Sequence, residues 1–430
     1  TGGTDGVNHT NGSVMVTGTS TKDATVTGRA GYGIANTAAD VKLEHGAVTG
    51  GTDGVYNTDG KVTLTDSSAV TGTTNGVNVT AGNVSVTDSK VTGTNGEGIA
   101  YTGYSSEGTK STGGGNVLIT GDSSVIGGTD GINYTNGSVT VTGTATKAVT
   151  VQGATGYGVA NTASDVKLEY ANVNAGEDGV YNTDGKVTLT DSTVTGGANG
   201  VNVTAGSVFV TNSEITGTTA DGIAYTGYSS AGTKATSTGN LTITGDSSVT
   251  GGQNGINYTN GSVSVTGSSS LNKTTVKGTA ANGIANTVGD VDLKNTEVTG
   301  GTNGIEKTGG SIVLDTDTIT GNGGAGIINT TGNITQAGNN SVISGTTYGI
   351  TTTKGSISLS GLNKKDSTVT GGTGGIYATT GDVRLTNETV TATTGDGIKG
   401  VGGAIGISGT DIIATGADGN GITATATIDG

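Results

Sequence analysis

A dipeptide of Gly followed by Val or Ile recurs along the whole chain, and it constrains the fold more than any other feature. It marks 18 repeat positions, and the commonest interval between them is 21–22 residues. The first occurrences are Gly6-Val7, Gly33-Ile34, Gly54-Val55, Gly76-Val77 and Gly98-Ile99. A unit this short cannot bury an apolar face by itself, so neighbouring units must stack on one another. The repeat therefore predicts a solenoid.

Each unit contains three short apolar stretches separated by turn residues. Between Gly54 and Gly76, Val62 and Leu64 alternate with Thr63 and Thr65, which is the period of a half-buried strand. Dense β-branched residues and Gly disfavour helices. We therefore predict an all-β, right-handed parallel β-helix of about 18 coils of mostly 21–22 residues, with right-handedness taken from the general crossover preference. The side chains of Val62 and Leu64 should share the inner face.

A longer period lies above the short one. The successive intervals 27, 21, 22, 22 and 33 are followed by 27, 21, 21, 22 and 33. Both 33-residue units hold a similar insertion, at 101–110 and 225–234. The pattern predicts a single β-helix solenoid over residues 1–430, with block repeats at approximately 1–125, 126–249 and 250–374 and a remnant at 375–430.

Composition excludes several classes of function. The chain has no Cys and only two His, so thiolate chemistry and histidine-rich metal centres are excluded. A net charge of −15 with 19 Lys+Arg argues against binding to nucleic acid. No apolar run approaches about 18 residues, so we expect no membrane insertion by this segment. The chain carries no signal peptide and is expected to be a mature or excised part of a longer protein.

Catalysis is not expected. The triplets Asn57-Thr58-Asp59 and Asn182-Thr183-Asp184 resemble the Asn-Thr-Asp motif of the polygalacturonase family, but that family's other motifs have no counterpart here. The acidic residues recur instead in turns, mostly before Gly: Asp5, Asp53, Asp130 and Asp178. We predict that the protein is not an enzyme, and a polysaccharide-active β-helix enzyme is the alternative.

Calcium and ice are two further candidate ligands. The period of 21–22 does not match the nine-residue repeat of calcium-binding β-rolls, so no cofactor is expected, although surface Ca²⁺ stays open. Thr-x-Thr pairs such as Thr63/Thr65 suit an ice-binding face, but Lys42 and Glu44 interrupt the same column. An ice-binding protein is the second alternative, and outward Thr of β-strands is the preferred explanation.

A column of Thr lies four residues after the repeated Gly. Its first members are Thr10, Thr37, Thr58, Thr80, Thr102, Thr135, Thr162, Thr183, Thr204 and Thr226. We interpret it as a structural Thr ladder whose hydroxyls bond neighbouring turn backbone or each other.

The two insertions are the candidate recognition loops. They contribute four of the 13 tyrosines, Tyr101, Tyr104, Tyr225 and Tyr228. Exposed aromatic residues on a rigid scaffold are typical of binding surfaces. The alternative is that these rings pack over the coils and only cover them.

The unit pattern, Gly-Val/Ile, turn, Val-x-Val/Leu-Thr, turn, Val-Thr-Gly, resembles bacterial surface β-helix repeat proteins. These include autotransporter passengers and filamentous-haemagglutinin-like adhesins. The resemblance implies an extracellular structural or adhesive rod at the bacterial cell surface, acting as a stalk or a self-assembling fibre in adhesion, cell–cell aggregation or matrix. The expected partners are other copies of the chain, joined end to end, and surface glycans or proteins of host or bacteria.

Overall fold

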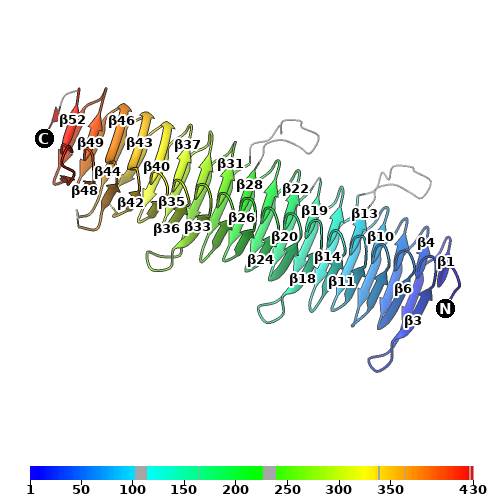
Figure 1. Ribbon diagram of the computed structural model, residues 1–430. Coiled ribbons are helices and arrows are strands. Elements are labelled where there is room, and N and C mark those ends of the chain that lie inside the picture. The colour runs from blue at the N-terminus through cyan, green and yellow to red at the C-terminus, as the bar shows by residue number, and fades with distance from the viewer. Residues whose placement is uncertain are drawn as a thin grey trace. The chain divides into compact units, whose positions relative to one another are not determined.

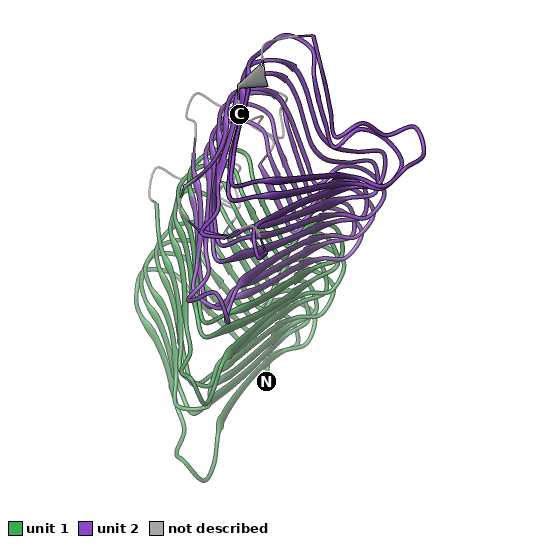
Figure 2. Cartoon of the chain, turned by 90° about the vertical axis from the view of Figure 1, so that its left-hand side faces the viewer, with its two compact units in different colours: residues 1–207, 228–233 green, residues 208–227, 234–430 purple. Residues whose placement is uncertain are grey.

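The computed structural model describes residues 1–101, 114–162, 164–225, 239–337, 339–363, 365–425 and 428–429. These divide into two compact units (Figure 2). Unit 1 comprises Thr1–Ser207, and unit 2 comprises the described residues from Val208 onward. The strands form three sheets, which are called the first, second and third sheet in the order of their strands within a coil.

Unit 1 contains all three sheets. Its first sheet is formed by β1 (Val7–His9), β4 (Ile34–Asn36), β7 (Val55–Asn57), β10 (Val77–Val79), β13 (Ile99–Tyr101), β16 (Ile132–Tyr134), β19 (Val159–Asn161), β22 (Val180–Asn182) and β25 (Val201–Val203). Its second sheet is formed by β2 (Val14–Thr17), β5 (Val41–Glu44), β8 (Val62–Thr65), β11 (Val84–Thr87), β14 (Val117–Thr120), β17 (Val139–Thr142), β20 (Val166–Glu169) and β23 (Val187–Thr190). Its third sheet is formed by β3 (Ala24–Gly28), β6 (Gly46–Gly50), β9 (Ala69–Gly72), β12 (Lys90–Gly93), β15 (Ser124–Gly127), β18 (Val149–Gly153), β21 (Ala171–Ala175) and β24 (Thr193–Gly196).

Unit 2 repeats this arrangement. Its first sheet is formed by β28 (Ile223–Tyr225), β31 (Ile256–Tyr258), β34 (Ile284–Asn286), β37 (Ile305–Lys307), β40 (Ile327–Thr331), β43 (Tyr348–Lys354), β46 (Gly374–Thr380), β49 (Ile398–Gly400) and β52 (Ile422–Ala424). Its second sheet is formed by β26 (Val208–Thr211), β29 (Leu241–Thr244), β32 (Val263–Thr266), β35 (Val291–Lys294), β38 (Ile312–Asp315), β41 (Ile334–Ala337), β44 (Ile357–Ser360), β47 (Val383–Thr386), β50 (Ile405–Ser408) and β53 (Ile428–Asp429). Its third sheet is formed by β27 (Glu214–Gly217), β30 (Ser248–Gly251), β33 (Thr274–Gly278), β36 (Thr296–Gly300), β39 (Thr318–Gly321), β42 (Val342–Gly345), β45 (Thr368–Gly371), β48 (Thr389–Ala392) and β51 (Asp411–Ala414).

Strands of successive coils pair in parallel, one coil directly above the next (Figure 1). The repeated Gly residues lie in register, because the N–H of Val55 donates to the carbonyl of Gly76 at 3.0 Å and that of Val77 donates to Gly98 at 3.0 Å. The described residues contain no helix, and together they form about 17 turns. The prediction of an all-β parallel β-helix is confirmed.

The core of each coil is a thin layer of inward-pointing aliphatic side chains. Val62 and Leu64 are both fully buried, whereas Thr63 and Thr65 between and after them are half-buried. The predicted inner face is therefore correct. In unit 2, Ile357 and Leu359 occupy the same positions and are buried in the same way.

The repeated Gly is required for space. A Cβ atom on Gly54 would lie 2.4 Å from Val70 Cγ1 and 2.7 Å from the carbonyl oxygen of Gly76. Any larger residue would push the third sheet away from the first, because these contacts join adjacent coils and adjacent sheets. This close approach explains why Gly precedes the buried Val or Ile in coil after coil.

Candidate functional site

Two of the four predicted recognition tyrosines lie inside the coils. Tyr101 and Tyr225 end strands β13 and β28 and are 3% and 1% exposed, so their expected placement on exposed loops is wrong. Inward and outward residues alternate along a strand, and Ile99 and Tyr101 therefore share the inner face. Tyr104 and Tyr228, with Thr102 and Thr226 of the Thr column, lie outside the described residues.

These buried tyrosines form ring pairs within each unit. The Tyr101 and Tyr134 rings are tilted by 32° with centroids 4.6 Å apart, and Tyr225 stacks on Tyr258 at 4.5 Å. The Tyr134 hydroxyl donates to the carbonyl of Gly82 at 2.8 Å. Burial raises the pKa of Tyr134 above its ordinary value. The pairs fill the core of the two coils that flank each insertion, which is a packing role.

At several positions the Thr column links a coil to the one before it, although the Thr80 hydroxyl is buried without a partner among the described residues. The Thr204 hydroxyl donates to the carbonyl of Thr183 at 2.8 Å. The hydroxyls of Thr183 and Thr58 donate in the same way to the carbonyls of Thr162 and Thr37. These hydrogen bonds give the column a structural explanation.

A second ladder, which the sequence analysis missed, consists of Asp and Asn directly before the repeated Gly. Asp53 Oδ1 accepts from the backbone N–H of Asn75 at 3.0 Å, and Oδ2 accepts from Asn78 Nδ2 at 2.9 Å. Asp178 in unit 1 and Asp221 in unit 2 make the equivalent pair of bonds. In the sequence, this ladder could have been recognised because its Asp and Asn residues always directly precede the repeated Gly. These carboxylates cap the next coil, which accounts for the recurring Asp-Gly turns.

Burial dominates the electrostatics at two positions of this ladder, Asp53 and Asp130. It raises the pKa of the Asp53 carboxyl, and hydrogen bonds from Asn78 and Asn75 offset part of that effect. Burial also raises the pKa of Asp130, against bonds from Tyr157 and Asn133. A carboxylate whose two oxygen atoms already accept from its own chain has little capacity left for a substrate.

Asp178→Ala is expected to destabilise unit 1 by about 1–3 kcal/mol, because it leaves the Asn199 N–H and the Asn202 amide without their acceptor. The measurement is the urea midpoint of the variant against that of the wild type. Asp184→Ala is the matched control, because Asp184 is exposed and, among the residues that the structure describes, bonds only the N–H of Gly185. Equal losses in both variants would contradict a capping role.

Half-buried tyrosine pairs lie on the outer side of the first sheet in unit 1. Tyr32 stacks on Tyr56 and Tyr157 on Tyr181, each with ring centroids 5.0 Å apart. In each pair, the first Tyr directly precedes a repeated Gly, and the second Tyr lies two residues after the next repeated Gly in the sequence. Asp53 and Asn78 occupy the same two positions in another pair of coils. Burial and then Glu177 raise the pKa of Tyr157 to about 12. The two tyrosines of each pair are 24 residues apart in the chain.

Unit 2 carries a related outer pair. Tyr348 stacks on Tyr377 with centroids 5.8 Å apart, and the Lys399 ammonium lies 5.7 Å from the Tyr377 ring centroid. This outer aromatic position is therefore used in both units, with a cation at one of them.

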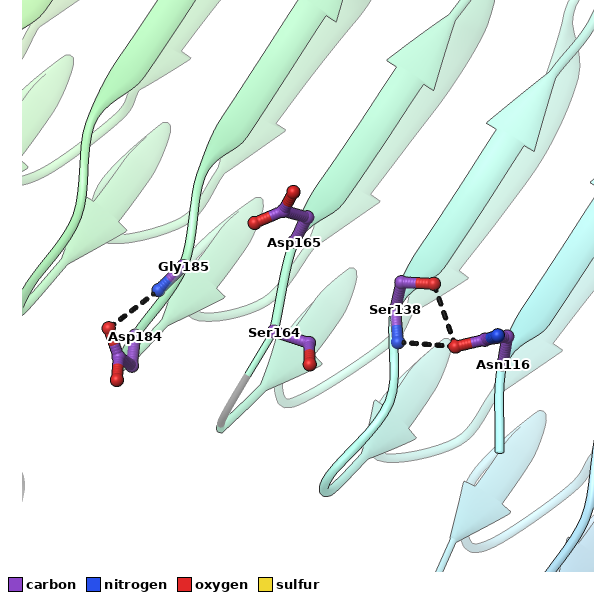
Figure 3. Close-up of a pocket in the computed structure, with 6 residues that line it drawn as sticks. All are labelled: Asn116, Ser138, Ser164, Asp165, Asp184 and Gly185. Carbon is purple, nitrogen blue, oxygen red and sulfur yellow. Dashed lines mark hydrogen bonds between the residues drawn. The ribbon is translucent and has the colours of Figure 1, made fainter. Parts of the chain in front are cut away.

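A polar hollow of about 390 Å³ lies on the turns after the first sheet of unit 1 (Figure 3). Its lining comes from successive coils and consists of Asn116, Ser138, Ser164, Asp165, Asp184 and Gly185. Asn116 Oδ1 accepts from Ser138 N at 3.0 Å and from Ser138 Oγ at 2.8 Å. Asp165 Oδ1 accepts from the N–H of Lys186 at 2.8 Å. The hollow is thus another set of capping contacts between turns.

Pairs of oppositely charged side chains lie on the outer face of the second sheet of unit 1. Lys42 bonds Glu44 at 3.2 Å and Lys167 bonds Glu169 at 2.8 Å, with side chains between 31% and 50% exposed. Such exposed pairs contribute little to stability. They agree with solvated charges that discourage sheets from pairing edge to edge.

Comparison with protein-family models, curated proteins and solved structures found no match. Within the described ranges, no cluster of three or more His, Asp or Glu could hold a metal ion. The same part of the chain has no helix with the length and apolar character needed to cross a membrane.

Proposed function

We propose that the chain is an extracellular structural and adhesive segment of a bacterial surface protein, of the autotransporter-passenger or filamentous-haemagglutinin-like type. The observation that carries this proposal is the repetition of the same capping contacts from coil to coil in each unit, as at Asp53, Asp178 and Asp221. A scaffold of this kind gains length by adding coils, and each coil supports only its neighbours.

The role is a non-catalytic one. Hydrolysis of a glycosidic bond needs two carboxyl groups held across the bond and available to it. Asp53 and Asp178 instead give their oxygen atoms to backbone and amide N–H groups. Their repetition along the chain supports a structural use.

The outer tyrosine pairs support adhesion. Tyr56 and Tyr181 present aromatic surface on a rigid sheet, where little conformational freedom is lost on contact. The partners proposed are surface glycans or proteins, and other copies of the chain. Exposed Met15 and Leu118 on the second sheet of unit 1 offer apolar contact for such copies.

Display of the chain on a non-adherent bacterium tests the proposal. Cells carrying it are expected to aggregate or to bind host cells, and cells with an empty display scaffold are not. Replacing Tyr56 and Tyr181 with Ser is expected to reduce binding to host cells, while Tyr134 stays in place to preserve the core. Binding equal to that of the empty scaffold would contradict an adhesive role.

Self-association is tested separately by light scattering across protein concentration. Growth of the scattering mass with concentration, resistant to added salt, is expected because apolar contact is not screened by ions. A chain that stays monomeric at every concentration would contradict the proposed self-association. Adhesion to other partners would then be the part of the proposal that stands.

A further inference from the structure

Two of three neighbouring buried polar side chains in unit 2 depart from the repeat. Gln336 on β41 takes an inner position that is Leu314 in the coil before and Leu359 in the coil after. Glu388 takes a corner position that is Ser341 and Ser367 in the two preceding coils. Gln336, Ser367 and Glu388 are at most 2% exposed.

Their side chains contact one another across coils. Ser367 Oγ donates to Glu388 Oε1 at 2.8 Å. Gln336 Nε2 donates to Ser367 Oγ at 2.9 Å and to Glu388 Oε1 at 3.3 Å, and it also bonds the carbonyl of Asn339. Gln336 Oε1 and Glu388 Oε2 are buried without a hydrogen-bond partner among the described residues.

This arrangement has the parts of an acyl-transfer site: a hydroxyl, a carboxylate that accepts its proton, and a carboxamide carbon beside the hydroxyl. The Gln336 carboxamide carbon is one bond from Nε2, which lies 2.9 Å from Ser367 Oγ. Attack on this carbon requires the plane of the amide to turn about the last side-chain bond. Elsewhere in the corner column the Ser hydroxyl bonds the backbone: Ser192 Oγ accepts from the N–H of Ala171 at 3.1 Å and donates to the carbonyl of Thr190 at 2.8 Å.

We propose that Gln336 and Ser367 join in an intramolecular ester that the chain forms by itself. Ser367 Oγ attacks the Gln336 carboxamide carbon, and Glu388 takes the hydroxyl proton. The carbon–nitrogen bond then breaks, Glu388 returns the proton to the departing nitrogen, and one ammonia leaves. The hydroxyl and the amide thus become an ester and ammonia, with no oxidant or further reactant.

The surroundings favour both formation and survival of the bond. Burial raises the pKa of the Glu388 carboxyl to about 7, against a hydrogen bond from Ser367, so the group can accept and return a proton near neutral pH. Exclusion of water protects the ester from hydrolysis. The reaction runs once per chain, so a rate far below that of an enzyme is sufficient. The ester would tie two consecutive coils together, and it does not depend on the proposed adhesive function.

The mass of the intact, folded full chain tests the proposal. The wild type is expected to lack one ammonia relative to the mass of its sequence, and a protease digest should contain the peptide with Gln336 joined to the peptide with Ser367. Ser367→Ala and Glu388→Gln should each restore the full mass. Ser341→Ala is the matched control, because Ser341 lies in the same column and should leave the loss unchanged.

Locating the loss of ammonia in the protease digest distinguishes the ester from other reactions that release ammonia. The Asn-Gly pairs of the chain can lose ammonia by forming succinimides within one peptide, with no joined peptides in the digest. A full-mass wild type, or a loss that maps to an Asn-Gly pair, would overturn the proposal even if a variant fails to fold.

Discussion

Val187→Asp is expected to open the neighbouring coils of unit 1 at a cost of several kcal/mol. Val187 on β23 is fully buried and pairs with Val166 of the preceding coil. The inner layer around it is aliphatic, so a new carboxylate would have neither water nor a cation there. The cost therefore combines lost apolar contact with the burial of an unpaired charge.

The loss of structure should be confined to the coils near Val187, because each coil contacts chiefly the coils next to it. Hydrogen exchange is the measurement, and protection should fall in β20 and β23 while β4 and β7 keep theirs. Thr188→Asp is the matched control, since Thr188 faces outward opposite Lys167 and should leave protection unchanged. Loss of protection throughout unit 1 in the Val187 variant would contradict this local behaviour.

The period of the sequence was sufficient to predict the strands and the core. Val62 and Leu64 are inward because Thr63 separates them, and the repeated Gly places the same pattern in each coil. This information is local: it needs only the order of residues within one unit.

The polar contacts could not be predicted in the same way. Asp53 meets Asn75 and Asn78 of the next coil, so its role depends on how two units align. Tyr101 is a different case, because its position follows from local sequence: Ile99 and Tyr101 alternate with Ala100, so an inward Ile99 predicts an inward Tyr101 ring. Its expected placement on the loop was wrong because it did not apply this alternation.

Buried polar residues are the least predictable part. Gln336 lies where the neighbouring coils have Leu, and Asp317 lies where they have Thr296 and Ser341. Composition gives no reason for either substitution. Their partners lie one or more coils away and become visible only when the coils are stacked. The chemistry proposed for Gln336 therefore rests on geometry that no single repeat contains.

The stability of unit 2 is expected to fall as pH rises from about 4 to about 7, because of Asp317. This side chain is 1% exposed and accepts from the N–H groups of Thr296 at 2.8 Å and Asp315 at 2.7 Å. Burial raises its pKa to about 7, although these bonds and the Lys273 ammonium favour the charged form. The folded state therefore holds a proton that the unfolded state, with a pKa near 4, has released.

The sign follows from this difference. Stability is complete below the unfolded pKa and declines until the folded pKa is reached, and the full loss is roughly 3–4 kcal/mol. Asp317→Ser should remove the part of the slope that Asp317 contributes and leave the part from buried Glu388, whose pKa is also raised. It should keep the bond to Thr296, because Ser192 and Ser68 make the equivalent bond in other coils. Urea unfolding of unit 2 at pH 4, 5.5 and 7.5 measures the effect, with the exposed Asp292→Ser as control. If the Asp317 variant kept the slope of the wild type, the titrating group would have to be another one, and Glu388 would be the next to replace.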